Sequence, residues 1–446
     1  METLQTFPYQ AVTFDRNGKV TGGLTDLVPY LGQEAPTDLI VMCHGFRNDA
    51  ADATNLYSEF LGNLAPQLNH AKLRGLLGQR KFVVAGALWP SMVFNEKGRE
   101  SRALSAAAAS EEEKRLRDLK KELPKTQHKH IDAMLKQLPQ ALLNNETAQQ
   151  AMAQSLLDLA AELGGGFTAE FSGAVQKGKA STLVRAFAFG DTGPVKSPGG
   201  GGGGAIGIPT LGPQAGSGAG AAQSVFGKVF GFVPKFVNLT TFLPMFARCA
   251  TIGEVGLTRI VREAKKARPA LRIHLVGHSL GGRAVTACAK GLLANPKNEA
   301  DSMLLLQAAY SHFGLSPGRG GRERGYFRDV IDKKSVILPI LATHSRHDSV
   351  VGFAYTSMAA LSLNNSKAVG DENSRFGGIG RNGVLDTPEA ENLDLKLAGD
   401  AYSFAPGKVY NLDGSREEKG VKLIADHGDV RNKHITWAFA SLLAMS

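Results

Sequence analysis

The sequence contains few cysteines and no long uninterrupted apolar run. Its 446 residues include only three cysteines, Cys43, Cys249 and Cys288, whose spacing fits neither a disulfide framework nor a metal site. The first residues show no basic segment followed by an apolar core, and no apolar stretch is long enough to cross a bilayer. These absences argue against disulfide-rich secreted proteins and membrane-spanning proteins. We therefore expect a cytoplasmic protein, and export by a route that uses no signal peptide stays open.

The charge of the chain is unbalanced toward the basic side. The formal net charge is +10, while the hydrophobic and charged fractions, 43% and 21%, are ordinary for a soluble globular protein. A basic surface attracts nucleic acids and anionic lipids. No nucleic-acid-binding motif accompanies the Lys and Arg residues, so a nucleic-acid partner is not expected. Two interpretations stay open: a solvated basic surface, and peripheral contact with an anionic membrane.

One stretch, 271–289, combines three successive patterns. Apolar residues typical of a buried strand lead into GHSLG at 277–281, and an Ala- and Val-rich segment of helical character follows. A sharp strand-to-helix turn strains the backbone of its central serine, and glycines on either side avoid collisions with the strand and the helix. The pattern predicts that Ser279 is a nucleophile and that the Leu280 N–H stabilises an oxyanion. The alternative is an ordinary tight turn, because the chain has 52 glycines.

The strand, the G-x-S-x-G segment and the helix together resemble the α/β-hydrolase family, whose lipases and esterases often carry G-H-S-L-G-G. The resemblance covers residues 38–90 and 252–445. It implies an α/β fold with a mostly parallel central sheet flanked by helices. It also implies that a catalytic acid and then a histidine follow the serine along the chain, at the ends of later strands. Neither a metal ion nor an organic cofactor is needed for this chemistry.

Short apolar runs elsewhere predict further strands of this sheet. They lie at 37–43, 82–88, 302–307, 335–342 and 421–424. Residues 1–95 and 251–446 are therefore expected to form the N-terminal and C-terminal halves of the hydrolase-like core.

Residues 96–250 are expected to form a large insertion between these halves. The part at 101–163 predicts two or three helices, punctuated by Pro124 and Pro139. The stretch at about 197–222 is rich in Gly, Ala, Ser and Pro. It cannot bury enough apolar surface to order itself, so it predicts a disordered loop.

Phenylalanines gather at the end of the insertion, in residues 225–246. Two prolines, Pro234 and Pro244, are expected to limit this segment to short helices. One interpretation is that the phenylalanines pack onto the sheet as core. The other is that they form a lid or acyl-binding wall over the nucleophile, because apolar side chains beside a flexible loop suit an apolar substrate. In that case Phe230 and Phe242 are candidate substrate-binding residues.

A His-Gly-Phe segment at 44–46 follows the strand expected at 37–43. In the family that the chain resembles, a His-Gly segment after an early strand supplies the second oxyanion donor. The resemblance therefore implies that the Phe46 backbone N–H acts together with that of Leu280. Losing one such donor costs about 3 kcal/mol of transition-state stabilisation. The His44 ring is expected to brace this loop rather than transfer a proton, and a substrate contact at His44 stays open.

Asp348 is the candidate catalytic acid. A serine hydroxyl is a poor nucleophile until a base takes its proton and an acid orients that base. The strand expected at 335–342 is followed by a short polar loop, then Asp348, then valines, which matches the position of the acid in the α/β-hydrolases. The alternative is that Asp348 only forms an Asx turn that opens the next helix.

Two late histidines are candidate bases. His427 lies in a loop after the strand expected at 421–424, next to Gly428, whereas His434 opens the last helix. A helix N-terminus disfavours the imidazolium that a catalytic histidine must become. We therefore predict that His427 is the base and that the His434 ring faces the core.

These residues together predict a serine hydrolase that cleaves carboxylic esters of lipid-like or other apolar acyl groups through an acyl-enzyme on Ser279. Asp348 and His427 complete the predicted triad. The expected partner is a small-molecule or lipid ester, and the sequence indicates no oligomeric state. Two alternatives stay open: a serine peptidase or acyltransferase on the same scaffold, and a non-catalytic hydrolase-like protein that binds a ligand or a membrane.

Overall fold

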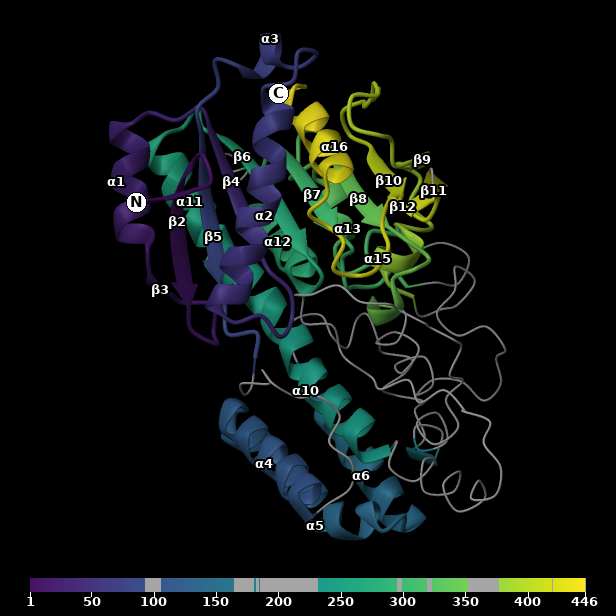
Figure 1. Ribbon diagram of the computed structural model, residues 1–446. Helices are drawn as coiled ribbons and strands as arrows, with labels where there is room; N and C mark the ends of the chain where they lie inside the picture. Colours follow the sequence, from purple (N-terminus) through teal and green to yellow (C-terminus); the bar gives the residue numbers. More distant parts are fainter. Residues whose placement is uncertain are drawn as a thin grey trace. The chain divides into compact units, whose positions relative to one another are not determined.

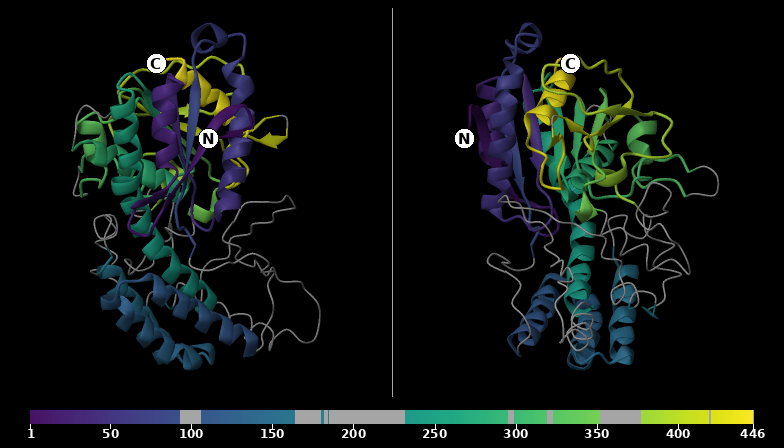
Figure 2. Two further views of the ribbon diagram at one scale, coloured as in Figure 1. Left: turned by 90° about the vertical axis from the view of Figure 1, so that its left-hand side faces the viewer. Right: turned by 45° about the vertical axis from the view of Figure 1, so that its right-hand side comes forward.

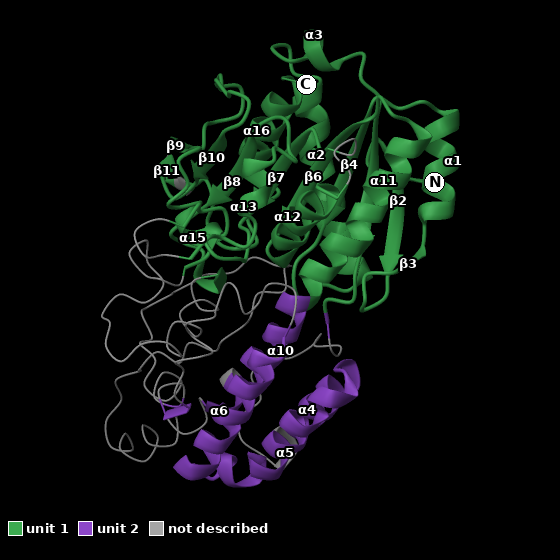
Figure 3. Cartoon of the chain, turned by 180° about the vertical axis from the view of Figure 1, so that it is seen from behind, with its two compact units in different colours: residues 1–91, 248–353, 370–446 green, residues 92–247, 354–369 purple. Residues whose placement is uncertain are grey.

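The chain forms two compact units, which Figure 3 distinguishes by colour. Unit 1 comprises 1–91, 248–353 and 370–446, and unit 2 comprises 92–247 and 354–369. The computed structural model describes residues 1–92, 106–163, 180–181, 184, 232–294, 299–318, 323–351, 377–418 and 420–445. The insertion expected at 96–250 overlaps unit 2. The Gly-rich stretch at about 197–222, expected to be a disordered loop, lies outside the described residues.

A ten-stranded, mostly parallel sheet forms the centre of unit 1 (Figure 1). Its strands follow the order β1-β2-β5-β4-β6-β7-β8-β10-β9, with β3 paired to β2. Only β1 and β3 run antiparallel to their neighbour, β2. The strands of this sheet are β1 (Glu2–Leu4), β2 (Phe7–Phe14), β3 (Val20–Gly22), β4 (Asp38–Cys43), β5 (Phe82–Leu88), β6 (Arg272–His278), β7 (Ser302–Leu306), β8 (Ile340–His344), β9 (Ala390–Asp394) and β10 (Val409–Asp413).

Helices cover both faces of this sheet, as the left view of Figure 2 shows. α2 and α16 pack together over one face, while α1, α11 and α12 lie over the other (Figures 1 and 3). Parallel strands joined by crossover helices require such a layered arrangement. The prediction of an α/β fold with a mostly parallel sheet flanked by helices is therefore confirmed. The helices described in unit 1 are α1 (Leu24–Gln33), α2 (Ala50–Leu68), α3 (Arg74–Leu77), α11 (Thr258–Ala267), α12 (Leu280–Leu292), α13 (Arg328–Asp332), α15 (Ile379–Asn382) and α16 (Lys433–Leu443).

The strands expected at 37–43 and 82–88 are confirmed by β4 and β5. All residues of β4 are buried, because helices cover both faces of the sheet at this point. On the face under α2 and α16, the rings of Phe60 and Phe439 pack with their centroids 6.0 Å apart. Burying one such ring stabilises the fold by about 2–3 kcal/mol.

Two of the later strands differ from the prediction. The strand expected at 335–342 begins only at Ile340, because Pro339 has no N–H to donate to the sheet and Val336 forms a single isolated bridge. The strand expected at 421–424 is the two-residue β12 (Val421–Lys422), which pairs with β11 (Glu417–Glu418) outside the main sheet. The main sheet instead takes β10, whose buried Asn411 interrupts the apolar pattern.

Unit 2 is helical in its described part. α5 packs against both α4 and α6. The expectation of two or three helices in 101–163 is confirmed. Pro124 separates α4 from the next turn as expected, but Pro139 lies inside α5 instead of ending it. The elements are α4 (Ala106–Glu122), the 3₁₀ turn η1 (Lys125–Gln127), α5 (His128–Leu142) and α6 (Glu146–Ala161).

The described part of the phenylalanine-rich segment belongs to one long helix, α10 (Phe232–Thr251), so the prediction of short helices was wrong there; residues 225–231 lie outside the described residues. Pro234 lies in the first turn, where a backbone N–H has no helical acceptor to lose. Pro244 removes one internal hydrogen bond, and the burial of Phe236 and Phe246 offsets that cost. The helix continues through the π-helical segment η2 (Ile252–Leu257) into α11. No helix among the described residues is both long enough and apolar enough to cross a membrane.

Candidate functional site

Ser279 occupies a sharp turn between β6 and α12. Its backbone angles are φ 56° and ψ −123°, in a region that side-chain-bearing residues rarely adopt. A Cβ atom on Gly277 would lie 2.3 Å from the Gly281 carbonyl oxygen, and one on Gly281 would lie 2.0 Å from the Cys43 carbonyl oxygen. Both contacts are impossible, so the strand can enter the helix at this angle only with glycines at these positions.

The loops that follow β4 and β7 hold this turn in place. A Cβ atom on Gly45 would lie 2.7 Å from the Ser279 Cβ, so the segment before Phe46 runs directly beside the serine. The Ser279 N–H donates to the Leu306 carbonyl, and the Ser279 carbonyl accepts from the Ala309 N–H, each at 3.0 Å. Leu280 is the first residue of α12, where a backbone N–H has no intrahelical acceptor. The turn therefore places a backbone N–H that has no acceptor within the helix directly after Ser279.

Asp348 and His427 form the second part of the site. The Asp348 Oδ2 lies 2.8 Å from the His427 Nδ1, and the aspartate side chain is fully buried. Its other oxygen, Oδ1, accepts the Val351 N–H at 2.9 Å. The carboxylate thus opens the next helical turn and binds the imidazole at the same time. A carboxylate acceptor at Nδ1 places the ring proton there and leaves Nε2 as the basic nitrogen.

The loop after β8, which carries Asp348, is itself held by side chains. Ser345 Oγ donates to the Ile424 carbonyl at 3.0 Å, which ties this loop to the segment that carries His427. Arg381 on α15 donates to the carbonyls of Arg346 and Asp348, at 2.8 and 3.2 Å. These bonds hold the backbone of the loop that carries the carboxylate.

The structure brings the Ser279 turn and the His427 loop together through His278. His278 Nε2 lies 3.0 Å from the His427 carbonyl oxygen, and the two ring centroids are 4.9 Å apart. Ser279 and His427 are both more than nine-tenths buried. Among the described residues, no hydrogen bond joins the serine hydroxyl to the His427 ring.

His44 is built into the loop beside Ser279. The Trp89 N–H donates to His44 Nε2 at 3.3 Å, so the ring proton is on Nδ1, which donates to the Gly45 carbonyl at 2.9 Å. The ring stacks on Trp89 with centroids 5.6 Å apart. Burial lowers the pKa of His44 to about 4, although its bond to Gly45 acts in the opposite direction. His44 is thus a neutral ring with both nitrogens occupied.

His434 does not face the core, contrary to expectation. It lies in the first turn of α16, which Asn432 caps by accepting the His434 and Ile435 N–H groups. The His434 ring is half-buried, and its Nδ1 accepts the Ala398 N–H at 3.0 Å. The ring thus contacts the loop that contains Ala398, and within the described part of the chain no hydrogen bond connects it to Asp348.

Of the two phenylalanines predicted to contact a substrate, only one lies in the described part of the chain. Phe230 lies outside the described residues. Phe242 is buried on α10 in unit 2, where its ring lies 5.9 Å from that of Phe246. Its predicted role therefore stays a prediction. Among the described residues, no group of three or more His, Cys, Asp or Glu side chains could hold a metal ion.

Two residues of the site were missed by sequence reasoning. His278 lies inside the motif at 277–281, but only the structure shows its bond to the His427 carbonyl. Gln307, directly after β7, is fully buried and has a positive φ of 44°. A polar residue at the carboxyl end of a buried parallel strand is the signal that could have identified it, because ligand sites form at that edge.

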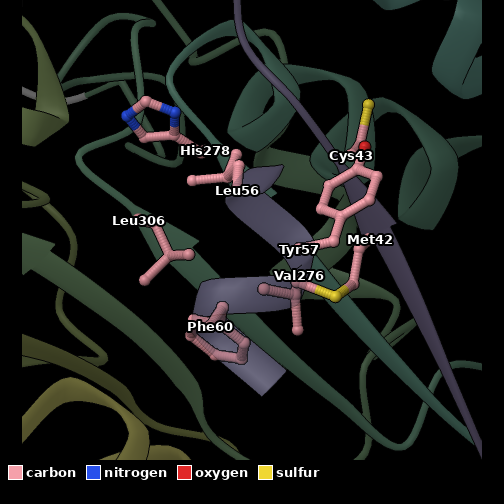
Figure 4. Close-up of a pocket in the computed structure, with 8 residues that line it drawn as sticks. All are labelled: Met42, Cys43, Leu56, Tyr57, Phe60, Val276, His278 and Leu306. Carbon is pink, nitrogen blue, oxygen red and sulfur yellow. The ribbon is translucent and has the colours of Figure 1, made fainter. Parts of the chain in front are cut away.

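A small apolar cavity lies behind the turn, with His278 at its edge (Figure 4). Its other walls come from α2, β4, β6 and β7.

Comparisons of the chain with models of known protein families, with curated protein sequences and with solved structures found no match.

Proposed function

We propose that this protein is a serine hydrolase that cleaves carboxylic esters through an acyl-enzyme on Ser279. The observation that carries the proposal is the 2.8 Å hydrogen bond between the buried Asp348 carboxylate and His427 Nδ1. This bond orients the His427 imidazole. The loop that carries His427 is bonded to His278, the residue before the strained Ser279. A serine, an imidazole and a buried acid with these connections are the components of acyl transfer by nucleophilic catalysis.

In the proposed reaction, His427 Nε2 takes the proton of the Ser279 hydroxyl as the oxygen attacks the ester carbonyl. The Leu280 and Phe46 N–H groups stabilise the oxyanion, and Asp348 stabilises the imidazolium. His427 then returns the proton to the leaving alcohol. In the second half, His427 takes a proton from water, the hydroxide attacks the acyl-enzyme, and the acid product leaves with Ser279 reprotonated.

An α/β-hydrolase fold is part of this proposal. The serine follows β6, the acid follows β8, and the histidine comes later in the chain, which is the order expected of that family. The His-Gly segment after β4 runs beside the serine, as the second oxyanion donor requires.

The proposed substrates are esters of lipid-like or other apolar acyl groups. The phenylalanines of α10 support this class by their composition, and the net charge of +10 supports contact with an anionic lipid surface. Initial rates on p-nitrophenyl esters from acetate to laurate test the proposal. We expect turnover by the wild type with a preference for longer chains. Absence of hydrolysis across the series would contradict it, while cleavage of peptides or acyl transfer to an added alcohol would favour the peptidase or acyltransferase alternatives.

A further inference from the structure

The His278 ring donates a hydrogen bond to the loop that carries His427. A carbonyl oxygen can only accept, so the 3.0 Å contact from His278 Nε2 to the His427 carbonyl requires a proton on Nε2. The remaining nitrogen, Nδ1, is buried and has no hydrogen-bond partner among the described residues. Burial lowers the pKa of His278 to about 3, and the nearby His427, Arg431 and His44 add to that effect. The ring is therefore neutral, in a single tautomer.

Gln307 holds the preceding residue of the same loop. Its Nε2 donates to the Asp426 carbonyl at 3.4 Å, while its Oε1 accepts from Thr343 Oγ1 at 3.1 Å. The bond to Thr343 orients the amide, so the N–H₂ end must face the loop. Two adjacent carbonyls, those of Asp426 and His427, are thus each held by a side chain from the end of a parallel strand.

The His427 ring is also bonded to Asp348, and the Ile424 carbonyl accepts from Ser345, both on the loop after β8. Further contacts lie within the loop that carries His427. Asp426 Oδ1 accepts the N–H groups of Gly428 and Asp429, at 2.7 and 3.1 Å. These bonds shape the loop but do not fix its distance from the nucleophile. The bond from His278 links the loop directly to the turn that carries the serine, because His278 immediately precedes Ser279 in the chain.

We propose that His278 is a positioning residue that sets the distance between the Ser279 hydroxyl and the His427 imidazole. This inference rests on the proposed hydrolase function. One rigid turn would carry both the nucleophile and the donor that holds the base. The neutral state of His278 matters as well, because a second cation 4.9 Å from His427 would oppose the imidazolium that forms during the reaction.

The test compares His278→Leu with His278→Gln in the full chain, on a short-chain p-nitrophenyl ester. Leucine fills the space without a donor, whereas the glutamine Nε2 can still reach the carbonyl. We expect His278→Leu to lower kcat by about 100-fold, the effect of misplacing a catalytic group by about 1 Å, with little change in KM. His278→Gln should recover most of that loss. His434→Leu, which removes another half-buried histidine, is the control and should keep the wild-type kcat.

A second measurement does not depend on activity. Hydrogen exchange of the peptide spanning 424–431, followed by mass spectrometry, should be faster in His278→Leu than in the wild type and slow again in His278→Gln. If the wild type hydrolyses no ester but exchange changes in this way, the proposed function fails and the contact stands. The proposal is overturned if His278→Leu keeps the wild-type kcat, if both variants lose activity equally with normal thermal unfolding, or if exchange is unaffected.

Discussion

Asp348 divides its two carboxylate oxygens between His427 Nδ1, at 2.8 Å, and the Val351 backbone N–H, at 2.9 Å. The Asx turn that was the alternative interpretation of Asp348 is therefore present, and it does not exclude the proposed role as catalytic acid, because the other oxygen binds the imidazole. The turn holds the carboxylate still while the second oxygen orients the imidazole. A carboxylate fixed in this way loses little freedom when it binds the ring, which strengthens the control of the His427 tautomer.

Replacing Asp348 with asparagine should nearly abolish activity without unfolding the protein. The asparagine oxygen can still accept the Val351 N–H, but its N–H₂ group then faces His427 Nδ1 and moves the ring proton to Nε2. We expect kcat to fall by about 10³- to 10⁴-fold. Steady-state kinetics measure this, and Asp394→Asn, on the exposed strand β9, is the matched control. A loss of tenfold or less would refute the role of Asp348.

Replacing Gly281 with alanine should destabilise the turn. The new Cβ would lie 2.0 Å from the Cys43 carbonyl oxygen, so backbone atoms would have to move. Overpacking of this kind costs about 1–3 kcal/mol. Gly32→Ala, at a helical glycine with open space around it, should instead stabilise α1 by up to about 1 kcal/mol. Urea unfolding of the two variants compares them, and equal stabilities would contradict this account of the turn.

His44 and His278 should be neutral in opposite tautomers, with the proton on Nδ1 in His44 and on Nε2 in His278. Burial lowers their pKa values to about 4 and about 3, below the ordinary value of about 6.5. The unfolded chain therefore binds protons that the folded chain does not, so stability is full above about pH 6.5 and falls as the pH drops toward 4. ¹⁵N spectra identify the tautomers, and urea unfolding at pH 7 and pH 5 measures the loss. A ring that titrates near pH 6.5 in the folded protein would show the prediction to be wrong.

At the opposite ends of the strands, Ser302, His274 and Asp38 form a hydrogen-bonded serine–histidine–aspartate network. His274 Nδ1 lies 2.8 Å from Ser302 Oγ, and His274 Nε2 lies 2.8 Å from Asp38 Oδ1. All three side chains are fully buried, and Arg80 also binds the Asp38 carboxylate. Because all three side chains are closed to solvent, we assign this network a role in stability.

Asp38→Asn should therefore reduce stability but leave kcat of the folded protein unchanged. Burial raises the pKa of Asp38, but bonds from Arg80 and His274 outweigh burial and hold the pKa below its usual range. Removing the charge breaks the buried ion pair between Asp38 and Arg80, at a cost of about 3–5 kcal/mol. Because the folded pKa is depressed, this stabilisation is present above about pH 4 and is lost at lower pH. Urea unfolding should show the wild type and the variant converging as the pH falls below 4; a constant difference would contradict the ion pair.

The sequence predicts the parts of the site that depend on local pattern. The glycines around Ser279 indicate the turn because the backbone packs there too tightly for a side chain at their positions. The positions of Asp348 and His427 follow from the order of strands and loops, and the structure places the two side chains within hydrogen-bond distance.

The remaining features depend on contacts between segments distant in the sequence. Pro244 is a strong signal against a helix, yet α10 continues through it because buried aromatic rings offset its cost. The polar Asn411 interrupts the apolar run of β10, so a search for apolar runs misses this strand. The structure can bury Asn411 because its amide bonds the backbone N–H and carbonyl of Val384. The contact between His278 and the His427 carbonyl could not be predicted, because the two residues are 149 positions apart in the sequence.

The identity of the nucleophile tests the central claim most directly. A fluorophosphonate probe reacts with activated serines, and mass spectrometry of the labelled protein locates the modified residue. We predict an adduct on Ser279 in the wild type and in Ser302→Ala, and none in Ser279→Ala. No adduct in the wild type, or an adduct that persists in Ser279→Ala, would contradict the account.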